Sequence, residues 1–244
     1  MDCQQYHIEA QIEHSHWWFF GRRKLFQKMI NDLVPRLSWR VLDVGTSTGT
    51  NLRLLNNMGF EDVTGLDLNP EAIRFCAEKG LGDVKLGDIE NLPFENETFD
   101  LILATDIIEH VEDDARAVQE LQRVLAPDGK LLITVPAFKA LWGHNDDTSH
   151  HKRRYVAREV LALIKSAGLH IRRDFYFNFL LFFPIWVARQ FIRRFTSRPM
   201  PENEMTPLLA NKVLSVIFSL DVTLAPNIHP PFGVSYLVVC EKQE

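Results

Sequence analysis

The sequence has few cysteines and no internal repeat. Its three cysteines, Cys3, Cys76 and Cys240, are odd in number and far apart, and none belongs to a CxxC pair. This pattern argues against a disulfide framework and against a structural zinc site, and it suits a reducing compartment. The first twenty residues lack a basic start followed by an apolar core, so we expect no secretory signal. We therefore expect a cytoplasmic protein.

A long uninterrupted apolar run is also missing. The most apolar stretch, residues 175–192, is broken by Asn178, Pro184 and Arg189. Since a spanning helix needs about 20 apolar residues, we reject a transmembrane span. Further arginines follow: Arg193, Arg194 and Arg198. Residues 175–198 fit a helix at the inner face of a membrane, but we favour a lid over a substrate pocket or a core helix.

What the sequence does contain is typical of a globular protein. Hydrophobic residues make up 46% and charged residues 24% of the 244 residues, which excludes a disordered or fibrous chain. The formal net charge is −5, yet residues 150–201 hold eleven basic and two acidic residues. This net +9 predicts an anionic partner such as a phosphate-bearing substrate, a membrane surface or a nucleic acid. A solvated face paired with acidic neighbours is the simpler interpretation.

Residues 40–136 alternate short apolar runs with helical segments. The predicted strands are 40–45, 63–68, 83–88, 99–106 and 130–136. The predicted helices are 51–58, 115–125 and one capped by Asn69 with Pro70 at its first position. Pro127, Asp128 and Gly129 predict a turn. The pattern predicts an α/β fold with a parallel sheet covered on both faces.

Beyond Pro136 the regular alternation of strands and helices ends. We predict a helix over 155–167 that stops at Gly168, strands over 169–177 and 235–242, apolar helices over 185–195 and 208–220, and a proline-rich turn over 226–231. We expect one domain. It comprises an N-terminal helical lid (1–39), a cofactor-binding core (40–177), an apolar and basic helical insertion (178–232) and a closing strand (233–244).

Polar and glycine residues follow the predicted strands, where open parallel sheets bind ligands. The first strand leads into a glycine-containing loop, residues 43–49, and the second ends at Asp67, which is placed to accept hydrogen bonds from a ribose. Asp88 and Ile89 follow the third strand and suit an adenine. The loop lacks the GxGxxG pattern and a basic residue for a pyrophosphate, which argues against a nicotinamide-dependent oxidoreductase.

Four segments resemble the class I S-adenosylmethionine-dependent methyltransferases: VLDVGTSTGTN (41–51), VTGLDLNPEAI (63–73), GDIENLPFENETFDLILATDIIEHV (87–111) and RVLAPDGKLLITVPA (123–137). The resemblance implies a Rossmann-like, doubly wound, seven-stranded sheet with the last strand antiparallel. It implies S-adenosylmethionine as cofactor and S-adenosylhomocysteine as product. The cofactor residues it implies are Asp43, Gly45, Thr46, Ser47, Asp67, Leu68, Asp88, Ile89 and Thr105. Ser47 stands where the family usually has a glycine.

The outer segments are similar to a narrower bacterial subgroup, often associated with cell-surface glycan or lipid pathways. They are the N-terminal HSHWWFFGRR (14–23), residues 144–155 and PFGVS (231–235). Within them, Arg22 is a candidate partner for the cofactor's carboxylate. The candidate acceptor-binding residues are Trp18, Asp106, His144, Arg153, Arg154 and Tyr155.

His110 and His151 are the candidate general bases, because a histidine titrates near neutral pH. Alternatively, Asp106, Glu109 and His110 resemble the Glu-x-x-Glu-His pattern of metal-assisted quinone-precursor O-methyltransferases and could hold a divalent metal. We favour the simpler interpretation, in which Asp106 caps a helix and Glu109 is solvated.

The sequence therefore predicts a methyltransferase that modifies an oxygen or nitrogen of a small-molecule or glycan- or lipid-linked acceptor, expected to be anionic. The target-base motif of nucleic-acid methyltransferases, [DN]PP[YF], is absent, so nucleic acid is not the expected partner. A non-catalytic cofactor-binding or membrane-surface protein is the alternative. The sequence does not specify the acceptor or the oligomeric state.

Overall fold

The computed structural model describes residues 3–195 and 206–243. The strands are β1 (Arg40–Val44), β2 (Asp62–Asp67), β3 (Asp83–Leu86), β4 (Phe99–Thr105), β5 (Leu125–Pro136), β6 (His170–Phe177) and β7 (Ser235–Glu241). The helices are α1 (Cys3–Ile12), α2 (Trp17–Leu33), α3 (Thr50–Met58), α4 (Pro70–Glu78), α5 (Asp114–Val124), η1 (Lys139–Leu141), α6 (His144–Thr148), α7 (Ala157–Ser166), α8 (Phe182–Phe195) and α9 (Leu208–Ile228).

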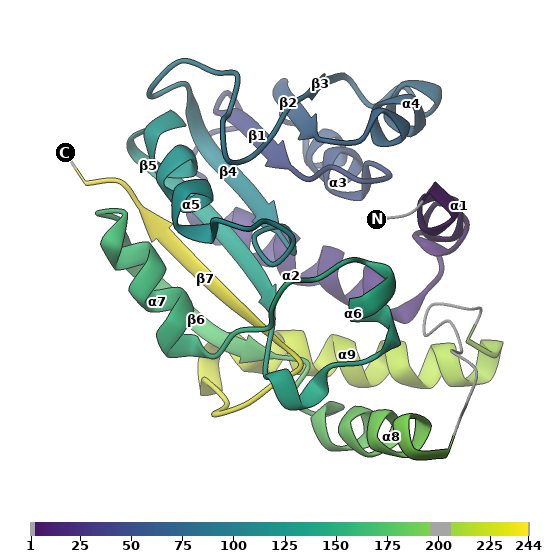
Figure 1. Ribbon diagram of the computed structural model, residues 1–244. Coiled ribbons are helices and arrows are strands. Elements are labelled where there is room, and N and C mark those ends of the chain that lie inside the picture. The colour runs from purple at the N-terminus through teal and green to yellow at the C-terminus, as the bar shows by residue number, and fades with distance from the viewer. Residues whose placement is uncertain (1–2, 196–205, 244) are drawn as a thin grey trace.

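All seven strands form one sheet in the order β3-β2-β1-β4-β5-β7-β6 (Figure 1). Strands β1 to β5 pair in parallel, and β7 pairs antiparallel with both β5 and β6. The predicted α/β class, with a doubly wound sheet and an antiparallel last strand, is confirmed. The carboxyl ends of the parallel strands therefore meet at one edge, where the predicted site residues lie.

Side chains alternate between the two faces of the sheet along each strand, and each face packs into its own hydrophobic core. On one face Leu42, Ile102 and Ile133 pack with residues of α5 and α7. On the other face Val41, Leu101 and the residues around them pack with α2, α3 and α9. Helix α2 thus covers the sheet, with Leu25 and Ile30 fully buried, whereas α1 lies farther out beside α4 (Figure 1).

Two predictions about proline turns are wrong. Pro226 lies inside α9, which continues to Ile228 and ends at His229 in a left-handed conformation. Pro226 has no N–H to donate to a carbonyl of the preceding turn, so the helix loses one backbone bond there. Ala225 and Pro226 are buried, and this packing offsets the loss. Residues 127–129 lie within β5, where a register shift between Phe99 and Leu101 of β4 absorbs them.

The basic segment is largely paired. Lys152 pairs with Glu112, Arg172 with Glu241 and Arg173 with Asp32. These partners lie in three separate regions of the chain, so most of the net +9 does not form one cationic face. Arg198, at the end of the segment, lies outside the described residues, as does part of the predicted insertion.

Candidate functional site

A cavity of about 730 Å³ opens at the carboxyl ends of the parallel strands. Its walls come from α1, α2, the loops after β1, β2 and β4, α6 with the segment that follows it, and α8. This size suits a small-molecule or cofactor site.

The loop after β1 holds three residues with positive φ: Gly45 at 76°, Ser47 at 47° and Gly49 at 86°. A glycine adopts this left-handed region without steric cost. Ser47 stands where the resembled family usually has a glycine, and it adopts a left-handed conformation. The Ser47 N–H donates to Asp67 Oδ2 at 2.9 Å.

Asp67 lies at the cavity wall with both oxygens accepting backbone hydrogen bonds. The Asn69 N–H donates to its Oδ1 at 2.9 Å. Each carboxylate oxygen has a second lone pair, so the group can still accept from a ligand's hydroxyls. Burial raises the pKa of Asp67, while the backbone donors at Asn69 and Ser47 oppose the rise.

Several buried polar atoms around this loop have no hydrogen-bond partner, among them Thr46 Oγ1 and Arg22 Nε, both from residues that line the cavity. Buried polar groups without partners are rare in proteins. Their presence beside Asp67 fits a bound polar cofactor such as S-adenosylmethionine.

Arg22 is placed where a cofactor carboxylate could reach it, but it already pairs with Asp106, with the Arg22 Nη2 to Asp106 Oδ2 distance at 2.9 Å. Its guanidinium also lies 5.6 Å from the Trp18 ring centroid. Trp18 in turn stacks on Phe218 of α9, with 5.3 Å between ring centroids. Trp18 therefore belongs to the α2–α9 packing and presents one part to the cavity.

Thr105 and Leu68 also line the cavity. Asp43 does not: it is fully buried and accepts a 2.9 Å hydrogen bond from Asn51 Nδ2, which also bonds Thr105 Oγ1 at 3.0 Å. Burial raises the pKa of Asp43 to about 7. The expected direct contact of Asp43 with the cofactor is replaced by support through Asn51.

Asp88 and Ile89 lie outside the cavity lining. Asp88 Oδ1 accepts from the Glu90 N–H at 2.9 Å, and Ile89 belongs to the hydrophobic core. The short strand β3 ends at Leu86, so these residues turn away along the sheet.

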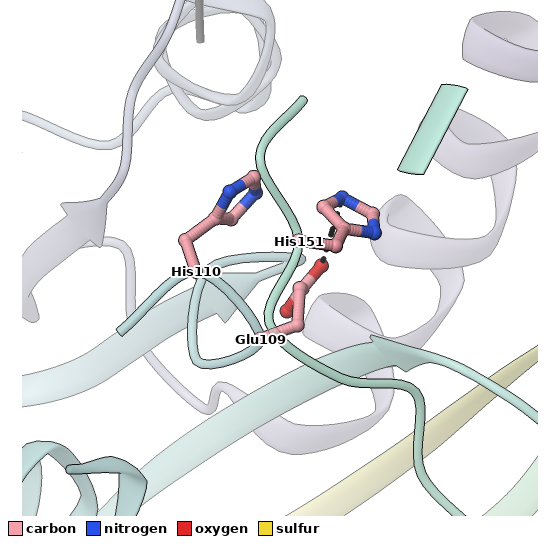
Figure 2. Close-up of side chains that lie close together, drawn as sticks. All are labelled: Glu109, His110 and His151. Atoms are coloured by element: carbon pink, nitrogen blue, oxygen red, sulfur yellow. Dashed lines mark ion pairs between the residues drawn. The ribbon is translucent and has the colours of Figure 1, made fainter. Parts of the chain in front are cut away.

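The far end of the cavity carries Glu109, His110 and His151, which converge from the loop after β4 and the segment after α6 (Figure 2). The rings of the two histidines are 4.6 Å apart in an edge-on arrangement. Glu109 is fully buried, and neither of its oxygens has a hydrogen-bond partner; Oε1 lies 4.0 Å from His151 Nε2. Burial raises the pKa of Glu109 well above its usual range.

Asp146 orients His151. The distance from His151 Nδ1 to Asp146 Oδ1 is 2.8 Å, and Arg154 Nε donates to the same oxygen at 2.8 Å. Burial alone would raise the pKa of Asp146, but the hydrogen bond to His151 and the Arg154 cation lower it to about 2. Asp146 is thus an ionised acceptor for His151 Nδ1, and His151 Nε2 lies 4.0 Å from Glu109 Oε1.

His110 has a different environment. Burial, reinforced by the neighbouring His151, lowers its pKa to about 4. His110 is therefore neutral at pH 7, and it is a weaker proton acceptor than an ordinary histidine.

Three predicted acceptor-binding residues are not in the cavity. Tyr155 is buried, and its hydroxyl donates to Asp114 Oδ2 at 2.8 Å; burial raises its pKa. Arg153 pairs with Asp114 at 2.7 Å on the other side of the loop. His144 does not line the cavity. Arg154 does line it, but its guanidinium bonds Asp146 and the Ala137 carbonyl.

The set of candidate metal ligands differs from the predicted one. Asp106 is held by Arg22 and by Thr134 Oγ1, which donates to Asp106 Oδ1 at 3.1 Å. The group whose ligand atoms lie within 4.8 Å of one another is instead Glu109, His110 and His151 (Figure 2). One carboxylate and two imidazoles could hold a divalent metal.

The sequence predicted helical structure over 1–39 but not the contacts that Glu9 and Glu13 make with the loop after β1. Ser47 Oγ donates to Glu9 Oε2 at 2.8 Å, and Thr48 Oγ1 donates to Glu13. Glu13 also pairs with Lys79 at 2.9 Å and Arg53 at 3.1 Å. No local pattern marks a helical glutamate as the partner of a loop more than thirty residues away.

Comparisons with known proteins agree with this geometry. Residues 42–133 match the family described as "Methyltransferase domain". A "Probable S-adenosylmethionine-dependent methyltransferase" of Mycolicibacterium smegmatis is 26% identical over 164 residues, covering 66% of this chain and 62% of the relative. A 2-methyl-6-phytyl-1,4-hydroquinone methyltransferase of Oryza sativa subsp. japonica is 36% identical, covering 42% of this chain and 31% of the relative. The chain thus spans less than two thirds of these relatives.

Solved structures share the fold. The YcgJ protein of Bacillus subtilis has a TM-score of 0.57 at 23% identity, covering 91% of this chain and 99% of its own. A phosphoethanolamine N-methyltransferase of Haemonchus contortus in complex with S-adenosyl-L-methionine has a TM-score of 0.60 at 18% identity, covering 89% of this chain and 52% of its own. The findings establish a Rossmann-like methyltransferase fold, and they support a class I methyltransferase with S-adenosylmethionine as its cofactor.

Proposed function

We propose that this chain, whose residues 42–133 match a methyltransferase domain, transfers a methyl group from S-adenosylmethionine to an oxygen or nitrogen of a small-molecule or glycan- or lipid-linked acceptor. One observation carries the proposal. The same cavity is lined by Asp67, by the left-handed loop after β1 and by His151, which Asp146 orients. Residues 14–23 further support the bacterial subgroup with that N-terminal signature.

S-adenosylmethionine, when bound, supplies an electrophilic methyl group. Asp67 and the loop after β1 would bind its nucleoside part, and Arg22 lies where a carboxylate could be met. These contacts position the methyl group, and positioning alone lowers the barrier of an in-line displacement substantially.

His151 is the proposed proton acceptor. Because ionised Asp146 accepts at Nδ1, the His151 proton sits on Nδ1 and Nε2 keeps a free lone pair, on a residue that lines the cavity. His151 takes the acceptor's hydroxyl proton at Nε2 as the new oxygen–carbon bond forms. Burial of Glu109 raises its pKa, which disfavours a second negative charge beside the acceptor oxygen.

The acceptor class is supported by the wall that α8 contributes. Ile185 and Ala188 line the cavity with apolar surface, next to the polar end formed by His151. An amphipathic acceptor, with an apolar chain and a hydroxylated head, matches this arrangement. We infer a cytoplasmic protein that works at the inner face of a membrane.

The first test is calorimetric titration with S-adenosylmethionine, with NAD as the control ligand. We expect saturable binding of S-adenosylmethionine alone, weakened at least tenfold in Asp67→Ala. The matched control is Asp62→Ala, an exposed carboxylate at the other end of β2, which should bind normally. Absence of binding by the folded wild-type protein would remove the proposal.

A further inference from the structure

Exposed apolar side chains are concentrated in one part of the molecule. Among the described residues, sixteen large apolar side chains are strongly exposed, and twelve of them lie between Leu180 and Ile228. Single exposed apolar residues are ordinary, but clustering of this kind marks an interaction surface.

Helix α9 carries seven of the twelve: Leu208, Leu209, Val213, Val216, Leu220, Leu224 and Ile228. From Leu209 onward they recur at intervals of three or four residues, so they form one stripe along the helix. At 1.5 Å per residue the stripe is about 29 Å long. The opposite side of α9 is apolar too, with Phe218 and Val222 buried against the α2 side of the core.

Helix α8 has two different faces. Ile185 and Ala188 line the cavity, whereas Phe183 and Val187 are 58% and 56% exposed. Trp186 is also exposed, at 39%. The outer face is therefore apolar and aromatic, which is typical of a helix at a membrane interface.

Asp221 of α9 joins the two helices into one surface. It accepts the N–H of Asn178 at 2.7 Å and the N–H of Leu180 at 2.8 Å, which fixes the approach to α8 against the middle of α9. Leu180 is itself 39% exposed. Figure 1 shows both helices at the end of the molecule farthest from β3. We call this surface the α8–α9 face: Leu180, Phe183, Trp186, Val187 and the α9 stripe.

Among the described residues of α8 and α9, the exposed charged side chains are cationic. Arg194 of α8 and Lys212 of α9 are exposed. The one acidic residue within the two helices, Asp221, is buried and accepts the two backbone bonds described above. An apolar face with exposed cations and no exposed carboxylate on its helices is complementary to an anionic lipid surface.

We propose that the α8–α9 face docks on the surface of an anionic phospholipid bilayer. By length and composition α9, with a mean hydropathy of 1.6, could cross a membrane. Its packing through Phe218 and its bonds through Asp221 hold it to the domain, so it lies on the bilayer. A second copy fits the face less well, because a symmetric contact would bring the same cations together.

Docking in this way places the α8 wall of the cavity next to the lipid. It requires neither the cofactor nor methyl transfer, so its outcome is separate from that of the proposed function. Val187 is exposed and does not line the cavity, unlike Ile185 and Ala188, so it would then meet acyl chains directly.

The test is co-sedimentation of the full chain with vesicles of phosphatidylcholine alone or of phosphatidylcholine containing phosphatidylglycerol. We expect binding to the anionic vesicles, reduced at least tenfold in Val213→Glu/Val216→Glu. The matched control is Leu37→Glu/Leu86→Glu, which alters two exposed apolar residues outside the face and should bind like the wild type.

Charge is tested separately. Arg194→Glu/Lys212→Glu should weaken binding to the anionic vesicles severalfold. The control Arg158→Glu/Lys165→Glu makes the same charge change on exposed positions of α7 and should not. Circular dichroism and urea unfolding show that each variant is folded. Equal binding by Val213→Glu/Val216→Glu and the wild type would overturn the proposal. A wild-type dimer that ignores vesicles and that the same variant dissociates would show instead that a second copy covers the face.

Discussion

At the scale of single residues, the pairing of His151 with Asp146 distinguishes this histidine from the others. A proton acceptor oriented by a carboxylate typically contributes a factor of about 10² to 10⁴ in rate. His110 lacks such a partner, and its pKa of about 4 makes it neutral but weakly basic. The structure therefore separates two histidines that the sequence left as equal candidates.

We expect His151→Gln to lower kcat by about 10² to 10³ with little change in cofactor affinity. The measurement is transfer of labelled methyl groups from S-adenosylmethionine to extracted membrane lipids. Asp146→Asn acts through His151, so the double variant should be no slower than His151→Gln alone. Asp146→Asn alone should also shift the pH dependence of kcat, a dependence that His151→Gln should abolish. His144→Gln, a histidine outside the cavity, is the control. Additive losses in the double variant would show that Asp146 does not act through His151.

Two predicted site residues that line the cavity, Asp67 and Ser47, are fixed by local backbone geometry. Asp67 ends a strand, and Ser47 occupies a left-handed position of a tight loop, so both follow from strand and turn patterns. Tyr155 and Arg153 were misplaced because their direction depends on Asp114, a helix residue about forty positions away. A long-range pairing of this kind leaves no local trace.

At the scale of elements, two carboxylates attach α1 to the cofactor loop. Glu13 is 1% exposed and binds Lys79 of the α4 end, Arg53 of α3 and Thr48. Glu9, one turn earlier, accepts from Ser47. Burial raises the pKa of Glu9, an effect that the Ser47 hydroxyl opposes. The N-terminal lid expected from sequence thus divides into a core helix, α2, and a covering helix, α1.

We expect Glu13→Gln to lower the free energy of unfolding by about 1–3 kcal/mol, because it leaves two cations without their buried anion. The affinity for S-adenosylmethionine should fall severalfold as α1 loosens from the loop. Urea unfolding and calorimetric titration measure the two effects. Glu61→Gln, an exposed carboxylate, should change neither. An unchanged unfolding curve for Glu13→Gln would show that α1 is not held through this residue.

Elements with strong periodic patterns were predicted well, and irregular ones were not. The parallel strands β1, β2 and β4 fall within a residue or two of the prediction because their apolar runs are continuous. The end of α9 was misplaced because Pro226 is a turn signal by composition, whereas packing of Ala225 and Pro226 in the core extends the helix. Tertiary burial outweighs local propensity there.

At the scale of the whole molecule, stability depends on buried titratable groups that act in opposite directions. Burial raises the pKa of Asp43 to about 7 and that of Asp221 to about 6. These two groups favour the folded state at low pH, and their contribution is lost as pH rises through those values. His110 is the reverse case, since its pKa is lowered from 6.5 to about 4.

An unfolded chain binds a proton at His110 below about pH 6.5, whereas the folded protein does so only below about pH 4. Folding is therefore opposed as pH falls through this window. For two pKa values this far apart, the free energy of unfolding falls by about 2 kcal/mol between pH 7 and pH 5. His110→Gln removes the titration and should remove that part of the pH dependence.

The measurement is urea unfolding of the wild type and His110→Gln at pH 7 and pH 5. The difference in unfolding free energy between the two proteins should shift by about 2 kcal/mol in favour of the variant at pH 5. The contributions of Asp43 and Asp221 cancel because both proteins share them. His170→Gln, an exposed histidine on β6, should show no such shift. If the two proteins keep a constant difference across the window, His110 is not held neutral by burial, and its role as a weak base next to His151 falls with it.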